Sequence, residues 1–383
     1  MNIHNVLFIV TLILQYKSYC SGLCRTTNDH KNHTCSGIRF NQIVLSLSTR
    51  LELLREKIYN CQETEIKEGI LSYPKLQNLT ISCGTINNIH KNAFLNFNNL
   101  QELNLSNNSL STFLPNVFGS LGYLQTLNIS QNNFKELTQF TFSGLNNLKK
   151  LIISNNKLTD FHPKVFDQIR NVQKMCLDHN EIDFLPVRLF TKLRKLQHLD
   201  LSNNYIESFG EVFVLAYNLR YLNLSFNVIK DIPLRAFQTT QLEILDLSNN
   251  KLEVIYEDGL QLKTLKELYL QINQIRLFEV GGLNMDSIPL QLLNVENNRL
   301  VFLEDDFVKT AKNLQTFKAI RNPWDCDCWY KMEAIRKQFL KSVLFHDDDE
   351  PLCVVGVIKD CKIGKPNLEY YYNIYSQQQN GQN

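Results

Sequence analysis

The sequence lacks a long apolar run and a strong excess of charge of either sign. Beyond its first residues, no stretch approaches the ~18 consecutive apolar residues of a membrane-spanning helix. Lys and Arg number 40 against 38 Asp and Glu, so the net charge is +2. This balance gives no strong electrostatic attraction to nucleic acid or to an anionic membrane surface. We therefore expect no membrane span and no nucleic-acid partner.

Arrangements typical of catalysis or metal binding are also missing. His179 and His198, with Asp178 and Asp200 nearby, have no accompanying nucleophile or third orienting group. The acidic stretch 346–350 (HDDDE) lacks the spaced oxygen ligands and the turn glycine of a calcium loop. The sequence thus predicts no enzyme, no cofactor and no metal site.

The amino-terminal residues are typical of a secretory signal. The apolar run 6–14 is too short to cross a bilayer, and cleavage after Cys20 or after Gly22 would leave small residues at the required positions. A buried strand is the alternative interpretation, since the region before the run carries no Lys or Arg. We predict a signal peptide at 1–20 and a secreted, extracellular protein. The polar tail 366–383 does not resemble a lipid-anchor signal.

One short pattern, L-x-x-L-x-L-x-x-N-x-L, recurs along most of the chain. A clear copy has Leu100, Leu103, Leu105, Asn108 and Leu110 at its defining positions. Eleven copies begin at Leu76, Leu100, Leu124, Leu148, Val172, Leu196, Leu219, Leu242, Leu265, Leu290 and Leu314. A leucine/asparagine signature at this period of 23 to 25 residues indicates a leucine-rich repeat solenoid. Such a fold presents a surface rather than an enclosed site.

The positions within a repeat, numbered from its first Leu, predict the local structure. Apolar positions 4 and 6 alternate with 3, 5 and 7, as in a strand with one buried face. We expect an α/β repeat in which parallel strands line the concave face of a curved horseshoe. Asn at position 9 should satisfy backbone groups of adjacent turns; these are Asn108, Asn132, Asn156, Asn180, Asn204, Asn227, Asn250, Asn273, Asn298 and Asn322. Gly84 takes that position in the first repeat, so the ladder should start one turn late.

A second apolar column precedes each repeat. It consists of Phe94, Phe118, Phe142, Phe166, Phe190, Phe213 and Phe237, five or six residues before the next first Leu. Aromatic rings stacked at this position would fill the convex side of the core.

Cysteines gather at the two ends of the repeats. After removal of Cys20, eight of the remaining nine form two clusters of four, as expected for disulfide-stapled caps in an oxidising compartment. If Leu54 opens a degenerate repeat, Cys61 and Cys83 occupy equivalent positions on neighbouring strands, ~4.8 Å apart. We therefore predict a Cys61–Cys83 disulfide. Cys24 and Cys35 then pair by elimination.

The carboxyl-terminal cysteines carry a specific resemblance. Residues 322–328 read N-P-W-D-C-D-C and are followed by a helical stretch, 330–340, and two more cysteines. This arrangement resembles the cysteine-rich cap of extracellular leucine-rich repeat proteins, in which the first Cys pairs with the third and the second with the fourth. The resemblance implies Cys326–Cys353 and Cys328–Cys361. A zinc site built from the same four cysteines is the alternative.

The wider resemblance covers roughly residues 50 to 361. The repeat is similar to those of Toll-type receptor ectodomains, small leucine-rich proteoglycans and insect leucine-rich immune proteins. The chain departs from these groups, because it shows no membrane span, no cytoplasmic signalling domain and no carboxyl-terminal coiled coil. The predicted organisation is a signal peptide (1–20), a cysteine-containing cap with a degenerate repeat (21–75), eleven repeats (76–322), a cysteine-rich cap (323–365) and a polar tail (366–383).

Apolar residues at positions predicted to face solvent are candidates for ligand binding. They form a stripe across four strands: Tyr221, Phe226, Ile244, Tyr269, Ile272 and Leu292. Aromatic anchors in such a stripe would suit a protein partner. The alternative is that these are ordinary scattered apolar residues on a surface.

Two further features bear on partners. Glycan acceptor sequons occur at Asn32, Asn78, Asn104, Asn107, Asn128 and Asn223. Glycans at Asn104 and Asn128 would direct a protein partner toward the later repeats, whereas one at Asn223 would crowd the stripe. Cys176 is the odd cysteine, which predicts either an intermolecular thiol and a disulfide-linked dimer or a small residue shielded by its neighbours.

These features and the resemblance together imply a secreted, non-enzymatic recognition protein. The partner would be an extracellular protein or a glycan-bearing ligand, in innate immunity or extracellular signalling. The alternative is a matrix or cell-adhesion component of the proteoglycan type. The repeats do not separate the two, because fold does not determine function.

Overall fold

The structure is a computed structural model that describes residues 24–43, 47–69, 71, 73–256, 260, 262–278, 288–303, 312–328, 330, 344–345 and 353–354. The predicted signal peptide and the polar tail lie outside these residues. The chain divides into two compact units, unit 1 (Met1–Glu181) and unit 2 (Ile182–Asn383), and each is described by itself.

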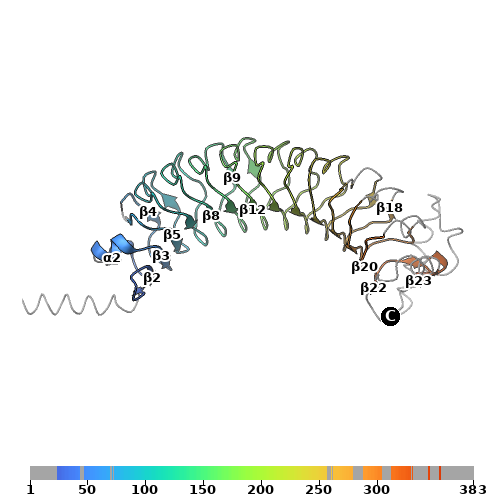
Figure 1. Cartoon of the computed structure of the whole chain (residues 1–383), viewed down its shortest axis with the longest axis horizontal. Helices are drawn as coiled ribbons and strands as arrows, with labels where there is room; N and C mark the ends of the chain where they lie inside the picture. Colours follow the sequence, from blue (N-terminus) through green and yellow to red (C-terminus); the bar gives the residue numbers. More distant parts are fainter. Residues whose placement is uncertain are drawn as a thin grey trace, which may run out of the picture. The chain divides into compact units, whose positions relative to one another are not determined.

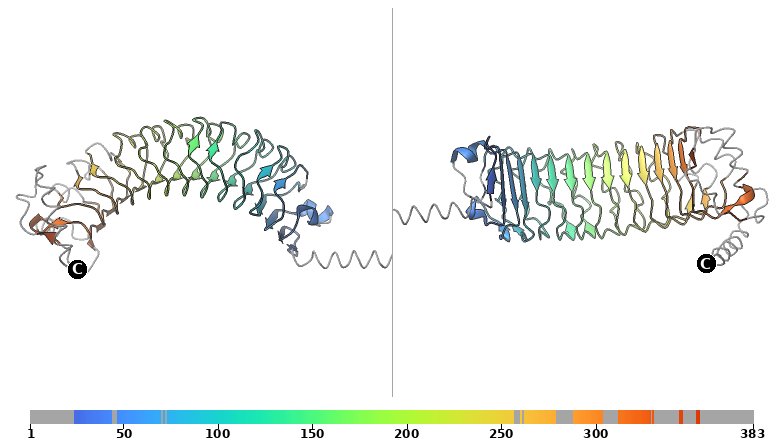
Figure 2. Two further views of the ribbon diagram at one scale, coloured as in Figure 1. Left: turned by 180° about the vertical axis from the view of Figure 1, so that it is seen from behind. Right: turned by 90° about the horizontal axis from the view of Figure 1, so that it is seen from below.

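Unit 1 is built on a sheet of eight strands, seen side by side in Figures 1 and 2. Its strands are β1 (Cys24–Thr26), β2 (Asn32–Ser36), β3 (Arg55–Tyr59), β5 (Asn78–Ser82), β7 (Glu102–Asn104), β8 (Thr126–Asn128), β10 (Lys150–Ile152) and β12 (Lys174–Cys176). β1 is antiparallel to β2, and each later strand is parallel to the one before it. The parallel arrangement follows from the repeat, since every turn returns the chain to the same edge in the same direction.

Short elements connect these strands in unit 1. β4 (Glu65–Ile66) pairs with β6 (Asn88–Ile89), and β9 (Glu136–Leu137) pairs with β11 (Asp160–Phe161), both in parallel. The 3-10 helix η1 (Phe40–Gln42) and the helix α2 (Leu47–Glu52) lie between β2 and β3. Turns occupy most of the remaining return segments.

Unit 2 repeats the same construction. Its sheet is formed by β13 (His198–Asp200), β14 (Tyr221–Asn223), β15 (Ile244–Asp246), β17 (Glu267–Tyr269), β19 (Leu292–Asn294), β20 (Thr316–Lys318) and β22 (Leu344–Phe345), all parallel. Two small parallel pairs accompany it: β16 (Val254–Ile255) with β18 (Leu277–Phe278), and β21 (Trp324–Asp325) with β23 (Cys353–Val354). The fold is therefore a solenoid of about eleven turns with a parallel sheet, as the repeat period predicts.

The asparagine ladder forms the contacts that the sequence predicts. In unit 1, the Oδ1 atom of Asn132 accepts from the backbone N–H of Leu110 at 3.0 Å, and its Nδ2 donates to the carbonyl of Leu105 at 3.0 Å. Asn250 repeats this in unit 2, accepting from Ile229 at 3.0 Å and donating to Leu224 at 2.9 Å. Each amide thus pairs backbone groups that would otherwise be buried without partners. The first such residue is Asn108, so the ladder starts one turn late, as Gly84 predicts.

The phenylalanine column is buried in both units. Its seven members have side chains that are at most 1% exposed. The rings of Phe142 and Phe166 stack in unit 1 with centroids 6.1 Å apart, and those of Phe213 and Phe237 stack in unit 2 at 5.8 Å. Burial of one such ring stabilises the fold by about 2–3 kcal/mol. The column therefore supplies much of the core opposite the sheet.

The two predicted disulfides at the amino-terminal end are present, but the register that predicted one of them is wrong by one residue. β3 and β5 align Arg55 with Asn78, so the counterpart of Leu76 is Leu53 and not Leu54. Cys61 therefore occupies position 9 of its turn, while Cys83 occupies position 8. The bond still forms because the two Cα atoms are 4.8 Å apart.

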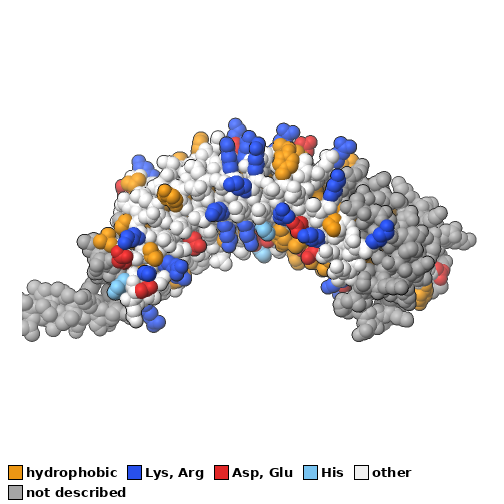
Figure 3. All heavy atoms as spheres, viewed as in Figure 1, with side chains coloured by type: hydrophobic (Ala, Val, Ile, Leu, Met, Phe, Trp, Pro, Cys, Tyr) orange, Lys and Arg blue, Asp and Glu red, His pale blue; other side chains and the backbone are white. Residues whose placement is uncertain are grey.

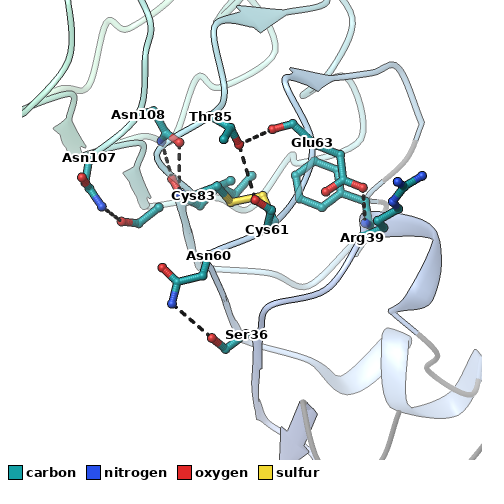
Figure 4. Close-up of a disulfide and its surroundings, with 12 residues drawn as sticks. Ser36, Arg39, Asn60, Cys61, Glu63, Cys83, Thr85, Asn107 and Asn108 are labelled. Atoms are coloured by element: carbon teal, nitrogen blue, oxygen red, sulfur yellow. Dashed lines mark hydrogen bonds between the residues drawn. A yellow bond between two sulfur atoms is a disulfide. The ribbon is translucent and has the colours of Figure 1, made fainter. Parts of the chain in front are cut away.

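The surroundings of this bond tie three turns together. Figure 4 shows Thr85, whose hydroxyl donates to the carbonyl of Glu63 at 2.5 Å, and Asn108, whose side chain bonds the backbone of Cys83. The second disulfide, Cys24–Cys35, joins register partners of the β1–β2 hairpin, whose Cα atoms are 4.1 Å apart. Among the helices that the structure describes, none has the length and apolar character that crossing a membrane requires.

Candidate functional site: the open face of the sheet

We call the sheet surface formed by side chains at repeat positions 2, 3, 5, 7 and 8 the open face, because these side chains point away from the core. In β14, Tyr221 and Asn223 are half-buried while Leu222 between them is fully buried. The same alternation recurs along each unit, as the period of a strand requires. The open face therefore recurs from turn to turn as a regularly repeated surface.

Position 5 of the open face is occupied mostly by Asn or Asp. Their side chains accept a hydrogen bond from the backbone N–H two residues later, as at Asn223 and Ser225 (3.0 Å) and at Asp246 and Ser248 (2.9 Å). This local bond turns the chain at the end of each strand. In unit 2, Tyr269 replaces the acceptor with an aromatic ring.

The six apolar residues predicted to bind a ligand all lie on the open face of unit 2. Tyr221, Ile244, Tyr269 and Leu292 are half-buried on consecutive strands, whereas Phe226 and Ile272 are 54% and 49% exposed. The register places Ile244 between Tyr221 and Glu267, and Tyr269 beside Asp246. The structure thus brings these side chains onto one surface, and binding at this surface stays a prediction.

The backbone at position 8 has an unusual conformation. In ten of the eleven repeats this residue has a positive φ of 53° to 57°. Five of the ten are Asn, which tolerates the left-handed region better than other side chains. Phe226 (φ 54°) and Ile272 (φ 57°) adopt the same conformation, which is costly for a bulky or β-branched residue.

Carboxylates surround the aromatic side chains of unit 2. The hydroxyl of Tyr269 donates to Glu267 at 2.8 Å. Burial, together with Glu267 and the nearby Asp246, raises the pKa of Tyr269 to about 12. Burial also raises the pKa of the Asp246 carboxyl, and the charge of Asp200 adds to this effect. The surface therefore carries negative charge in a partly desolvated setting.

The open face of unit 1 has a different chemistry. Ile152 and Cys176 are register partners at position 5, and both are half-buried. Lys150 and Lys174 lie on the same two strands, and Lys149 immediately precedes the first of them. The structure places Cys176 at the open-face position that its repeat predicts. A disulfide-linked dimer through Cys176 stays a prediction.

A polar chain that sequence reasoning missed lies beside Cys176. Ser154 donates to Asp178 Oδ1 at 2.5 Å, and Asp178 Oδ2 lies 3.0 Å from His179 Nδ1. The aspartate separates the hydroxyl from the imidazole, whereas a serine hydrolase needs the histidine between the other two groups. This order does not activate the serine as a nucleophile.

A buried polar cluster joins β2 to β3, where His33 and Glu56 are register partners. His33 Nδ1 is 3.0 Å from each Glu56 oxygen, and both side chains are at most 2% exposed. Burial raises the pKa of Glu56, and the His33 contact opposes this effect. Cys24, His33 and Cys35 lie close enough to hold a metal ion, but the disulfide engages both sulfurs. The cluster therefore fits a structural role in fastening β2 to β3.

The predicted glycan acceptors lie on strands and turns of the described surface. Asn104, Asn128 and Asn223 are half-buried, and each accepts a hydrogen bond through Oδ1 from the backbone N–H two residues later. Asn107 is exposed at position 8, and its Nδ2 donates to Ser82 at 3.3 Å. Glycosylation at these residues, and at Asn32 and Asn78, stays a prediction.

At the carboxyl-terminal end, Cys326 and Cys328 are both disulfide-bonded. The predicted partners, the Cys353 side chain and Cys361, lie outside the described residues. β21 and β23 pair Trp324 with Cys353 through their backbones. Trp324 is fully buried, and its indole N–H donates to the Ala319 carbonyl at 2.9 Å.

A second asparagine ladder escaped sequence analysis. Five asparagines immediately precede the first Leu or Val of their repeats, and each donates through Nδ2 to a backbone carbonyl one turn back. They are Asn99, Asn147, Asn171, Asn218 and Asn313. The recurring Asn before the first apolar position is the signal that could have revealed it. This ladder fixes the return segments where they re-enter the sheet.

The parallel sheet, the asparagine ladder and the buried phenylalanine column together define a leucine-rich repeat solenoid that presents a sheet surface. The family described as Leucine rich repeat matches residues 74–134, 122–182, 170–229 and 217–275. The chain belongs to this family. A comparison with curated proteins finds no match.

Several solved structures are similar to this chain. The complex of LRIM1 and APL1C matches with a TM-score of 0.64 and 17% identity, over 93% of this chain and 74% of that one. The leucine-rich repeat domain of APL1 matches with a TM-score of 0.58 and 17% identity, over 84% and 98%. The Drosophila Toll–Spatzle complex matches with a TM-score of 0.58 and 16% identity, over 86% and 55%. At these identities the likeness establishes the fold alone.

Proposed function

We propose that this chain is a secreted, non-enzymatic recognition protein that binds an extracellular protein or a glycan-bearing ligand through its open face. The observation that carries the proposal is the group of six apolar side chains on the open face of unit 2. Exposed apolar side chains that include aromatic residues are typical of protein-binding sites. The predicted signal peptide and the disulfides support an extracellular location.

The similar structures support a role in immunity or signalling. One is described as a complex of LRIM1 with APL1C, and another as a complex of Toll with Spatzle in development and innate immunity. On this support, the proposed role is recognition of a soluble partner in innate immunity or extracellular signalling.

Expression of the full chain in cultured cells tests this function. We expect the protein in the medium and a stable complex with at least one member of a panel of purified extracellular proteins and glycoproteins. Retention inside the cell would contradict the proposed location. Binding confined to insoluble matrix, with no soluble partner in the panel, would favour the adhesion role over the proposed one.

A further inference from the structure

Two residues of unit 2 sit in a backbone conformation that their side chains disfavour. Phe226 and Ile272 have φ values of 54° and 57° at position 8, where neighbouring repeats carry Asn203, Asn249 and Asn297 in the same conformation. An asparagine in their place would lower the local backbone strain. Strain of this kind persists only where something compensates for it.

Packing within the chain gives little compensation. About half of the Phe226 side chain and half of the Ile272 side chain face solvent. The turns that carry them are separated by one repeat, that of Asn249, so their backbones are ~10 Å apart at the usual strand spacing. Ile244 and Tyr269 lie on the strands of the two later turns. We name Phe226, Ile244, Asp246, Tyr269 and Ile272 the anchor surface.

Charge on the anchor surface and around it is mainly negative. The open-face positions of the repeats that begin at Leu196 to Leu290 contain five carboxylates: Asp200, Glu243, Asp246, Glu267 and Glu296. The two basic side chains at these positions, Arg220 and Lys266, both pair with Glu243. Among the described residues, no Lys or Arg lies within ion-pair distance of Asp246 or Glu267. Hydrophobic and acidic side chains also adjoin along the strand edge in Figure 3.

The five repeats of unit 1 lack this combination. Their open-face positions hold two carboxylates, Glu102 and Asp178, and three lysines. The apolar side chains at the open-face positions of unit 1 are Ile152, Cys83 and Cys176. The anchor surface is therefore a local feature and not a general property of the repeat.

We propose that the anchor surface docks a segment of an extracellular protein that carries a Lys or Arg side chain next to an apolar one, a proposal that rests on the function proposed above. The basic group complements Asp246 and Glu267 and lies against the ring of Tyr269, where a cation is attracted by the aromatic face. The apolar group is buried between Phe226 and Ile272. Burial by a partner compensates for the strain that packing within the chain leaves.

A random peptide library displayed on phage, selected against the immobilised full chain, tests this proposal. All proteins carry Ser225→Ala and Ser248→Ala. The first change removes the sequon at Asn223 but keeps the Asn223 side chain, and the second prevents Asp246→Asn from creating a sequon at 246–248, so no glycan covers the surface. We expect enriched peptides to contain Lys or Arg beside an aromatic or aliphatic residue. Enrichment of acidic peptides, or no enrichment above that on a chain carrying Asp246→Asn and Ile272→Asn, would overturn the proposal.

Synthetic versions of the enriched peptides then locate the site. We expect Asp246→Asn and Ile272→Asn each to weaken their binding by about tenfold or more. Leu234→Asn is the matched control, because Leu234 is 68% exposed in the same repeat as Phe226 but lies off the sheet. Both test variants keep residue types that other repeats use at positions 5 and 8, so loss of folding is not expected. Equal binding by the test variants and the control would place the site elsewhere.

Failure of this inference and failure of the proposed function give different results. If an extracellular partner from the panel binds wild type and the Asp246→Asn and Ile272→Asn variants equally, the recognition function stands and the anchor surface is wrong. If the panel yields no partner but basic–apolar peptides bind and are lost in the variants, the surface is right and the panel lacked its partner class.

Discussion

Position 8 shows how a single residue in each turn sets the path of the chain. Its left-handed backbone ends the strand and directs the next residue, the ladder asparagine, into the core. Asn adopts this left-handed conformation readily and presents a polar side chain to solvent. Phe226 and Ile272 adopt the same conformation with backbone strain and present apolar side chains. The type of residue at position 8 is therefore a compromise between stability and surface chemistry.

We predict that Ile272→Asn stabilises unit 2 by about 1 kcal/mol, because it relieves a strained β-branched residue that is half exposed. Phe226→Asn should act in the same direction. Chemical denaturation followed by circular dichroism measures the change. Asn249→Ala, at the same position of the intervening repeat, should have the opposite sign, and a loss of stability in Ile272→Asn would contradict the prediction.

Asp246 gives a pH dependence with a definite sign. Burial raises the pKa of this carboxyl in the folded state above its unfolded value, so the folded state holds the proton more tightly. The contribution of Asp246 to stability is therefore greatest below its unfolded pKa and is lost as the pH rises through the folded pKa. The Asp246→Asn variant cannot lose a proton there, so it does not lose stability as the pH rises. Its side-chain amide oxygen still accepts a hydrogen bond from the backbone N–H two residues later, as that of Asn223 does.

The predicted result is that Asp246→Asn unfolds at a higher temperature than wild type at neutral pH and that the difference shrinks toward about pH 4. Thermal melts at a series of pH values measure it, with both proteins carrying Ser248→Ala so that Asp246→Asn creates no N-x-S sequon. A variant that is less stable than wild type at neutral pH would show that the carboxylate is compensated within the chain.

At the scale of the strand and the turn, the sequence predicts what depends on periodic burial. Strand positions, the asparagine ladder and the phenylalanine column follow from the repeat, because each turn must bury the same face against its neighbours. Leu53 and Leu54 could not be separated, since both are apolar and the first turn departs from the consensus pattern. Only the backbone pairing of Arg55 with Asn78 decides between them.

Features that depend on side-chain direction could not be predicted. The contact of Ser154 with Asp178 joins neighbouring turns through rotamers that the pattern does not specify. The left-handed conformation of Phe226 and Ile272 could not be predicted from the sequence either, because neither residue type favours a positive φ. The anchor surface was thus partly predicted as a set of apolar residues, while its strain and its acidic neighbours came from the structure.

The Cys61–Cys83 disulfide provides an element-scale prediction. It closes a loop with a sequence separation of 22, so its removal should lower the free energy of unfolding of unit 1 by about 3 kcal/mol. The double variant Cys61→Ser with Cys83→Ser leaves no thiol from this pair to form new bonds. Denaturant unfolding measures the change, and an unaltered midpoint would show that hydrogen bonds such as Thr85 to Glu63 suffice to hold the first turns.

For the whole molecule, the repeat architecture makes stability a sum of nearest-neighbour contributions. Asn156 illustrates this, because its side chain bonds Phe134 and Ile129 of the preceding turn and Ile153 of its own turn. A defect at one ladder residue should therefore spread along the chain only gradually.

We predict that Asn156→Ala lowers the local free energy of opening by about 2–3 kcal/mol, because it leaves buried backbone groups unpaired. Hydrogen exchange should show lost protection in β8 and β10 and little change in β17. Lys157→Ala, an exposed change beside it, serves as the control. A uniform loss of protection in both units would instead indicate one cooperative structure.

The second asparagine ladder has a consequence for how the number of repeats can change in evolution. The block 148–171 is preceded by Asn147 and ends with Asn171, and each of these residues donates to a carbonyl one turn back at 2.7 Å. Unequal recombination that deletes or copies the 24 codons of this block in frame rebuilds the same junction, an asparagine followed by an apolar residue. Gene length can then drift by whole turns while every surviving turn keeps its contacts, and new surfaces can arise by copying an old one and altering its position 8.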